Sequence, residues 1–367
     1  MSEVKIRIMD KLYILFLLIT TGLIAIQFDN LSTEILDDSG QLFSYNKNKY
    51  LCFLCVVMYL IISMRDLSVG SDTYGYVKSF ELLNTSNGIL FYDRDPAFSI
   101  LNYLLRHITS NGRIYLFLVS WPLPLSFYLL MKDEKQTCKF VYLGFILLLL
   151  LEIFAFSMAG IRQTIAIFFT VLAYKFLDRD KIIGFLISIA IGATFHLSSI
   201  LFLLVFPLRK LKFGVLHIAL LLAFLVIVKV NPDQIFSIIN GNVLGEAYGS
   251  YGTVYESDAS YTMMTIQIIL LCLLLINRHI MYEDVSNRML LNNAWLGIIA
   301  GACSPVIAEF FRIAFYFSIY LCLLIPKILF SMCNSTNRRI CCWGVFLCAV
   351  SYMVFFTNPL AGYSFFW

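Results

Sequence analysis

Four short segments of the chain place polar side chains next to long apolar runs, where they could contact an anionic or sugar substrate. The first covers residues 65–76, which directly follow an apolar stretch. Gly70 permits a tight turn there, and Ser71 or Asp72 can cap a following helix whose free N–H groups suit a phosphate. The alternative is an ordinary capped turn that follows a snorkelling Arg65.

The second segment, residues 159–163, carries an arginine at the end of an apolar stretch that continues to Leu177. The planar, permanently charged guanidinium of Arg162 suits a diphosphate, and the amide of Gln163 can hydrogen-bond a sugar hydroxyl. Alternatively, Arg162 lies at the membrane interface and reaches a lipid phosphate.

The third segment, residues 195–199, has the sequence Phe-His-Leu-Ser-Ser. An imidazole inside a membrane segment normally faces a cavity or a partner, and its ordinary pKa lets it act as a general base near neutral pH. His196 is therefore a candidate base. A structural polar contact is the alternative.

The fourth segment carries Glu309 and Arg312 at the start of an apolar stretch that ends near Phe330. Arg312 could supply another cation to a diphosphate, or the two side chains could form an ion pair within one helix. Glu152 is an isolated carboxyl inside an apolar run, where it could anchor a neighbouring helix.

The composition places these segments in a membrane. The 367-residue chain is 60% hydrophobic and 14% charged, against about 45–50% and about 25% in soluble domains. Apolar runs such as 140–156, 215–230 and 341–356 approach the ~20 residues that cross a bilayer. We expect an all-α polytopic membrane protein, a single transmembrane domain over residues 1–367 with roughly 11–13 transmembrane or re-entrant helices.

Other protein classes are disfavoured by the charge and by the motifs. The net charge of +4 is spread over short clusters, so nucleic-acid binding is not expected. The ten cysteines are scattered, mostly in or beside apolar runs, and no Cys/His set has metal-ligand spacing. No nucleotide-binding or soluble-hydrolase motif occurs. We predict neither a metal nor a cofactor, and we expect residues 12–26 to be a retained membrane segment.

The distribution of lysine and arginine predicts the topology, because cytoplasmic loops are enriched in these residues. Residues 231–260 contain neither and are therefore expected to be an external loop. This places the motif segment 65–113, Arg162 and Arg312 outside. The first span fits poorly, since the acidic stretch 29–38 would then be inside: either this span is unusual, which we favour, or the Arg65 region is internal. The predicted cytoplasmic loops contain the basic residues of 132–139, 179–181, 209–212, 278–288 and 338–339.

Two segments are not predicted to be ordinary spans. Asp95-Pro96 is a good helix start, and the apolar residues that follow it have helical spacing, which predicts an interfacial amphipathic helix within the external segment 65–113. Residues 182–208 are too short for two ordinary crossings. We expect two short spans or a re-entrant hairpin, with His196 at the midpoint.

The order of the polar segments resembles a known family. Arg65, the run Val69-Gly70-Ser71-Asp72-Thr73, Tyr76, Arg162-Gln163, residues 195–199 and Arg312 resemble in that order the EpsG/Wzy group of O-antigen and exopolysaccharide polymerases, over roughly residues 65–330. The resemblance implies a GT-C-like, metal-independent glycosyltransferase of the bacterial inner membrane. Its donor and acceptor would both be undecaprenyl-diphosphate-linked glycans, and a chain-length regulator is a candidate partner alongside the lipid bilayer.

The resemblance and the chemistry together give each residue an expected role. Fixed cations can stabilise the leaving diphosphate, and a base must take the proton of the acceptor hydroxyl. His196 is the first candidate base and Asp72 the second. The residues expected to bind substrate are Arg65, Tyr76, Arg162, Gln163 and Arg312.

Three other functions remain open. A flippase or transporter for the same lipid-linked glycan should show internal repeats and polar breaks at the midplane, whereas here the polar residues gather at the outer interface. A ligase that moves glycan onto a lipid acceptor would share the architecture of a polymerase, so the sequence separates these two poorly. A membrane acyltransferase is the third.

Overall fold

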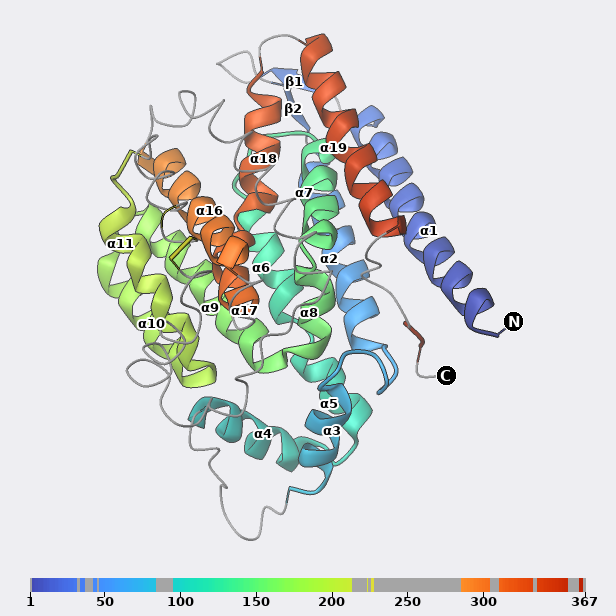
Figure 1. Ribbon diagram of the computed structural model, residues 1–367, viewed down its shortest axis with the longest axis vertical. Coiled ribbons are helices and arrows are strands. Elements are labelled where there is room, and N and C mark those ends of the chain that lie inside the picture. Colours follow the sequence, from blue (N-terminus) through green and yellow to red (C-terminus); the bar gives the residue numbers. More distant parts are fainter. Residues whose placement is uncertain are drawn as a thin grey trace. The chain divides into compact units, whose positions relative to one another are not determined.

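The computed structural model describes residues 2–31, 34–36, 42–44, 46–83, 95–212, 223, 226–227, 285–303, 310–332, 335–355 and 363–365. The described part is almost entirely helical, as predicted, with one short antiparallel pair of strands, β1 (Glu34–Leu36) and β2 (Leu42–Ser44). The chain divides into two compact units, one of Met1–Leu203 with Leu321–Trp367 and the other of Leu204–Tyr320 (Figure 1). The single domain predicted for residues 1–367 stays a prediction.

Several helices are long and apolar enough to cross a membrane, which makes the chain a membrane protein. Among the described residues there are three such spans, or up to five if each of two bent helix pairs is one span. The predicted total of roughly 11–13 spans includes segments outside the described residues, so it stays a prediction. The three spans are Leu12–Asn30 of α1 (Ser2–Asn30), Gly112–Met131 of α5 (Gly112–Val119) with α6 (Pro122–Met131), and α19 (Ser335–Phe355).

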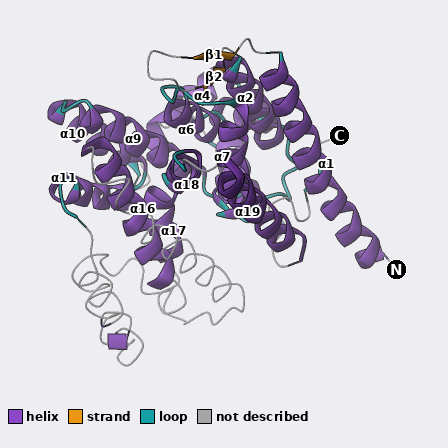
Figure 2. Ribbon diagram, turned by 90° about the horizontal axis from the view of Figure 1, so that it is seen from above, coloured by secondary structure: helices purple, strands orange, loops and turns teal. Residues whose placement is uncertain are grey.

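The first unit is a helix bundle around α7 (Cys138–Leu150). Almost every side chain of α7 is buried, as expected for a helix that is apolar on all sides. It packs against α1 and α18 (Leu321–Phe330), while α9 (Ile161–Asp178) packs against α6 and α10 (Ile182–Phe195) (Figures 1 and 2).

The end of α1 explains why an acidic stretch lies beside a basic loop. The Asp29 carboxylate accepts hydrogen bonds from the backbone N–H groups of Cys138 (2.7 Å) and Lys139 (3.3 Å), in the first turn of α7. A carboxylate there satisfies free donors and interacts favourably with the helix dipole. The acidic end of α1 therefore lies at the end of the bundle that holds loop 132–139, as the favoured interpretation of the first span requires.

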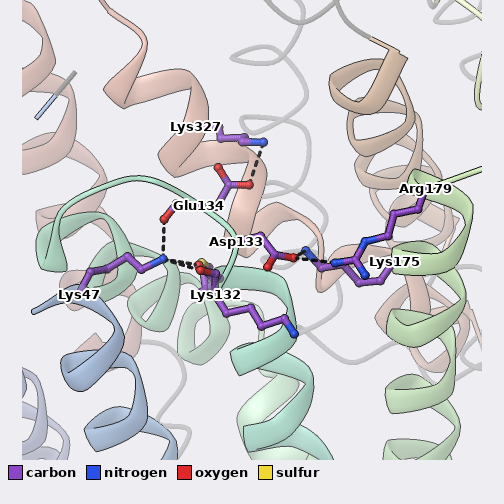
Figure 3. Close-up of polar contacts among 8 residues, drawn as sticks. Lys47, Lys132, Asp133, Glu134, Lys175, Arg179 and Lys327 are labelled. Atoms are coloured by element: carbon purple, nitrogen blue, oxygen red, sulfur yellow. Dashed lines mark hydrogen bonds and ion pairs between the residues drawn. The ribbon is translucent and has the colours of Figure 1, made fainter. Parts of the chain in front are cut away.

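Lysine, arginine and acidic side chains gather at this end of the bundle (Figure 3). Lys47, the first residue of α2 (Lys47–Ser63), is buried and donates to the backbone carbonyls of Met131 (3.0 Å), Lys132 (2.9 Å) and Glu134. The loop between α6 and α7 thus ties together the ends of three helices. We call this group the basic-end cluster: besides Lys47, it contains Asp133 with Lys175 (3.2 Å) and Arg179 (3.7 Å), and Glu134 with Lys327 (2.9 Å).

Two helices connect the basic-end cluster with the Arg65 and Arg162 segments. Helix α2 has 17 residues and ends at Ser63, and α9 has 18 residues and begins at Ile161. At about 1.5 Å per residue, each covers about 25 Å. The two polar groups therefore lie at opposite ends of the bundle.

Short helices cover the Arg65 end of the first unit. Helix α3 (Thr73–Glu81) precedes α4 (Pro96–Ile108), which lies across the end of the bundle in Figure 1. Asp95 is at the N-cap and Pro96 at the first helical position, as predicted, although the Asp95 side chain makes no capping bond. Helix α8 (Ile153–Ala159) follows α7 after a bend of 56° at Glu152, whose φ of 58° is left-handed.

The segment 182–208 forms two short apolar helical stretches, in agreement with the sequence. Helix α10 ends at Phe195, His196 has extended backbone angles, and a 3-10 helix (η2, Leu197–Leu204) leads into α11 (Val205–Leu208). The break at His196 therefore lies where it was predicted.

The second unit contains α11, α16 (Val285–Cys303) and α17 (Phe310–Ser318) in its described part. Helices α16 and α17 approach closely at Gly297, where an added Cβ would lie 2.6 Å from the backbone nitrogen of Ser318. The Asn292 amide donates to the carbonyls of Leu208 and Leu211 (3.1 Å) and so links α16 with the end of α11.

Candidate functional site

The turn before α3 is fixed against the end of α8. Gly70 has a φ of +84°, and a Cβ there would lie 2.6 Å from the carbonyl oxygen of Met158. Thr73 donates its hydroxyl to the same carbonyl (2.8 Å). Only glycine fits this backbone conformation and this close approach without strain, so the predicted tight turn is confirmed.

Arg65 is enclosed by this turn and is only 1% exposed. Its Nε donates to the Thr73 hydroxyl (3.3 Å), Nη2 to the Met158 carbonyl (3.1 Å), and Nη1 to the Ile62 carbonyl and the Ser120 hydroxyl (3.5 Å). Most of its five N–H groups are therefore engaged within the protein. In this structure Arg65 joins the end of α2 to the ends of α5 and α8.

A second arginine, which the sequence did not single out, completes the turn. Arg113 donates to the Arg65 carbonyl (3.0 Å) and forms an ion pair with Asp66 (3.2 Å). The backbone N–H of Ser68 also bonds Asp66 (3.0 Å), and together these bonds hold the pKa of Asp66 below its usual range. Arg113 and Asp66 are far apart in sequence, so no local pattern marks them as partners.

Arg162, unlike Arg65, is partly exposed at this end of the bundle. Its side chain is 36% exposed and forms an ion pair with Asp95, whose side chain is only 7% exposed. Its Nε donates to the Tyr76 hydroxyl (3.1 Å), and the guanidinium carbon lies 5.7 Å from the centroid of the Tyr76 ring. Two of the three guanidinium nitrogens are thus held in place. Within the described part of the chain, Nη2 makes no hydrogen bond and can receive an anion.

Tyr76 contacts Arg162 through both its hydroxyl and its ring. Its ring makes an edge contact with Phe98 of α4 (5.6 Å between centroids). Burial raises the pKa of Tyr76, although the neighbouring Arg162 acts in the opposite direction. The phenol therefore stays neutral at physiological pH and accepts the Arg162 hydrogen bond. Tyr76 lies beside Arg162, and the contact of either residue with a substrate stays a prediction.

In the first turn of α9, the side chain of Arg162 is partly exposed, whereas that of its neighbour Gln163 is buried. Gln163 is buried, as are Ile161 and Ile165, which belong to the core beneath α3 and α4. The guanidinium of Arg162 is therefore the accessible group of this motif, and the Gln163 amide is turned into the protein. A contact between Gln163 and a sugar stays a prediction.

Asp72 lies at the N-cap of α3, one helical turn from Tyr76. It occupies an N-cap position that the sequence predicted, but its side chain is exposed and makes no capping bond. Its backbone carbonyl accepts from the Tyr76 N–H (3.0 Å). Residues four apart share a helix face, which places the Asp72 carboxylate on the side of α3 that holds Tyr76 and Arg162.

His196 follows a residue that packs against the same core. The Phe195 ring stacks on Phe169 of α9 (5.6 Å between centroids) and contacts the buried cluster that includes Phe98 and Ile161. The His196 Nδ1 lies 2.7 Å from the Ser198 hydroxyl, so the imidazole is oriented by its own loop. Its role as a general base stays a prediction.

Arg312 lies in the second unit, on α17. Its guanidinium carbon is 5.6 Å from the centroid of the Phe311 ring, and the side chain is partly buried. Glu309, its expected ion-pair partner, falls outside the described residues, as does the predicted external loop 231–260. Convergence of Arg312 with Arg162 on one substrate stays a prediction.

Comparison with protein families decides the assignment. The model of the EpsG family matches residues 48–366, most of the chain. The chain belongs to the EpsG family. This is the family of Wzy-type polymerases, so the protein is a polysaccharide polymerase-like membrane protein. No curated protein and no solved structure matches the chain.

The EpsG match spans all four polar segments found in the sequence: 65–76, 162–163, 195–199 and Arg312. The structure brings Asp72, Tyr76 and Arg162 to one end of the bundle. It adds the ion pairs of Asp95 with Arg162 and of Arg113 with Asp66, which sequence patterns did not indicate. Within the described ranges, no group of three or more His, Cys, Asp or Glu residues is arranged to hold a metal ion.

Proposed function

We propose that this EpsG-family protein joins undecaprenyl-diphosphate-linked oligosaccharide repeats into O-antigen or exopolysaccharide at the external face of the bacterial inner membrane. The observation that carries the proposal is Arg162, an accessible guanidinium that Tyr76 and Asp95 hold in one orientation at the end of a long helix. Such a planar fork matches the oxygens of a diphosphate. The family match supports a lipid-linked glycan as the source of that diphosphate.

The proposed reaction transfers a glycan from one lipid carrier to another. The bond between the donor sugar C1 and the diphosphate oxygen breaks, and its electron pair leaves with the diphosphate. The oxygen of the acceptor hydroxyl bonds to C1, and its proton passes to a base. Arg162 stabilises the charge that develops on the leaving diphosphate, with Arg312 as a second proposed cation. His196 is the first candidate base, and Asp72 is the second because it lies on the Tyr76 side of α3.

The length of the helices supports the external placement of the site. Helices α2 and α9 each cover about 25 Å, near the ~30 Å thickness of the hydrocarbon core. Their far ends lie in the basic-end cluster, and loops rich in lysine and arginine are normally cytoplasmic. With that cluster inside, Arg162 lies at the outer surface, where flipped lipid-linked repeats are available.

Deletion of the gene tests the reaction. Surface polysaccharide separated on a gel should then show single repeat units in place of a ladder. Loss of all glycan from the lipid core would indicate a ligase instead, and loss of outward-facing lipid-linked repeats would indicate a flippase.

Complementation with Arg162→Lys tests the site. Lysine keeps a positive charge opposite the buried Asp95, so the protein level should be retained, but it lacks the planar fork. We expect the ladder to be lost or greatly shortened. The matched control is Arg179→Lys, an exposed residue at the other end of α9, which should restore the full ladder. A full ladder with Arg162→Lys would contradict the assignment.

A further inference from the structure

Helix α4 is amphipathic, but its apolar side chains are exposed and its polar side chains are buried, the reverse of a surface helix in a soluble protein. Its exposed face is apolar, because Ile100, Leu104 and Ile108 are 40%, 56% and 73% exposed and follow one another at every fourth residue. Such a face suits a bilayer interface. Phe98 packs into the core of the first unit on another side of the helix. A remaining face, turned into the protein, is polar.

The polar face consists of Asp95, Ser99, Asn102 and Arg106. Their spacings of four, three and four residues place them within a sector of about 60° at ~100° per residue. Asp95, Ser99 and Asn102 are all buried. The row starts at the ion pair between Asp95 and Arg162 and extends about 16 Å along the helix.

Two polar atoms on this face have no partner among the described residues. The Oδ1 of Asn102 accepts no hydrogen bond although the residue is only 6% exposed, and the Nη1 of Arg106 donates none. The rest of the Arg106 guanidinium is fixed, since Nε donates to the Leu83 carbonyl (3.2 Å) and Nη2 to the Glu81 carbonyl (2.9 Å). Buried polar atoms of native proteins nearly always have a partner, so this acceptor and this donor are two positions on one face that a bound hydroxyl group can satisfy.

We propose that the polar face of α4 binds sugar hydroxyls of the repeat unit whose diphosphate is held by Arg162. A hydroxyl both donates and accepts, so it can satisfy the Asn102 acceptor and the Arg106 donor alike. The row leads away from Arg162 along one helix face, as a glycan extends away from its diphosphate. This inference rests on the proposed function and names the part of the substrate that α4 recognises.

The decisive variant is Asn102→Leu, which replaces the amide with an apolar group of similar size. Because the Asn102 acceptor has no partner among the described residues, its removal should leave the thermal stability of the free protein unchanged or higher. Loss of one sugar hydrogen bond should raise the KM for the lipid-linked repeat about five- to tenfold. Asn102→Ser, which keeps a hydroxyl, should recover part of this loss. Leu104→Ala, on the exposed face of the same helix, is the matched control and should behave as wild type.

Two ligands separate this inference from the proposed function in thermal-shift measurements on the purified full-length protein. The first is the undecaprenyl-diphosphate-linked repeat collected from the deletion strain, and the second is undecaprenyl diphosphate without sugar. Both should stabilise the wild type, since both present a diphosphate to Arg162. The variant Asn102→Leu should respond normally to the sugar-free lipid and lose most of the additional shift that the glycan provides.

Each remaining result overturns a defined claim. Wild-type KM and thermal shifts in Asn102→Leu would show that water or nothing occupies this face. A lower melting temperature of the free variant would show that Asn102 has a structural partner. If neither lipid shifts the wild type, the proposed function fails, whereas equal shifts from both lipids would remove only the glycan contact on α4.

Discussion

The arginines of the candidate site differ in what their guanidinium groups touch. Arg65 and Arg162 both stand beside apolar stretches, and the sequence assigned both to substrate. In the structure Arg65 is enclosed by Met158, Thr73 and Ser120, whereas Arg162 keeps an accessible edge. The difference arises from the turn around Gly70, which encloses the guanidinium of Arg65 and leaves that of Arg162 partly exposed. We infer that Arg65 positions the turn and that Arg162 meets the diphosphate.

Replacing Arg65 by lysine should therefore affect stability first. A single ammonium group cannot reach acceptors that lie in several directions, and each buried acceptor left unpaired costs about 1–3 kcal/mol. We expect Arg65→Lys to lower the melting temperature of the purified protein by several degrees and to reduce its level in membranes. The exposed Arg179→Lys should melt like wild type. A stable but inactive Arg65→Lys would instead support direct substrate binding.

His196→Gln distinguishes a catalytic base from a structural histidine. Glutamine keeps a hydrogen-bonding group near Ser198 but cannot take up a proton at neutral pH. A general base contributes about 10²–10⁴-fold to rate, so polymer chains should become much shorter at an unchanged protein level. Ser198→Ala, which removes the hydroxyl beside Nδ1 and keeps the imidazole, serves as the control and should have a smaller effect. Normal chain lengths in His196→Gln would make Asp72→Asn the next variant to test.

The sequence predicted the helix starts, turns and breaks that depend on residues close together in the chain. The Asp95-Pro96 helix start, the turn at Gly70 and the break at His196 each depend on residues close together in the chain. The pairing of Arg162 with Asp95 was not predicted, because it joins elements 67 positions apart. The Arg113–Asp66 and Asp29–α7 contacts were missed for the same reason. Hydropathy specifies which segments are buried, but not which polar ends meet.

The break between α7 and α8 gives a prediction about backbone strain. Glu152 has a φ of 58°, which costs a residue other than glycine of order 1 kcal/mol or more. Glu152→Gly should therefore be more stable than Glu152→Ala by about 1 kcal/mol, since both remove the carboxylate but only glycine accepts the angle freely. Thermal melting of the two variants in detergent measures the difference. Equal melting temperatures would show that the bend relaxes without cost.

At the scale of the helix bundle, the positions of the charged residues and the length of α9 agree: both place the basic-end cluster and Arg162 at opposite ends. The loops that the charge rule assigns to the cytoplasm contribute Asp133 and Arg179 to one cluster, and the last turn of α9 contributes Lys175. The Arg162 end of α9 lies about 25 Å away. The acidic end of α1 joins the basic side because Asp29 caps α7. A local capping interaction thus holds the acidic end of α1 beside the loop 132–139. The side of the membrane on which this end lies stays a prediction.

Cysteine labelling measures this arrangement directly. Ser71 is exposed in the turn before α3, and Lys135 is exposed in the loop that contains Asp133 and Glu134. We expect Ser71→Cys to react with an impermeant thiol reagent in intact spheroplasts, and Lys135→Cys to react only after the membrane is permeabilised. The unsubstituted chain gives the background from native cysteines. The reverse pattern would place Arg162 in the cytoplasm, where it could not meet flipped glycans, and the proposed polymerase reaction would fail together with the topology.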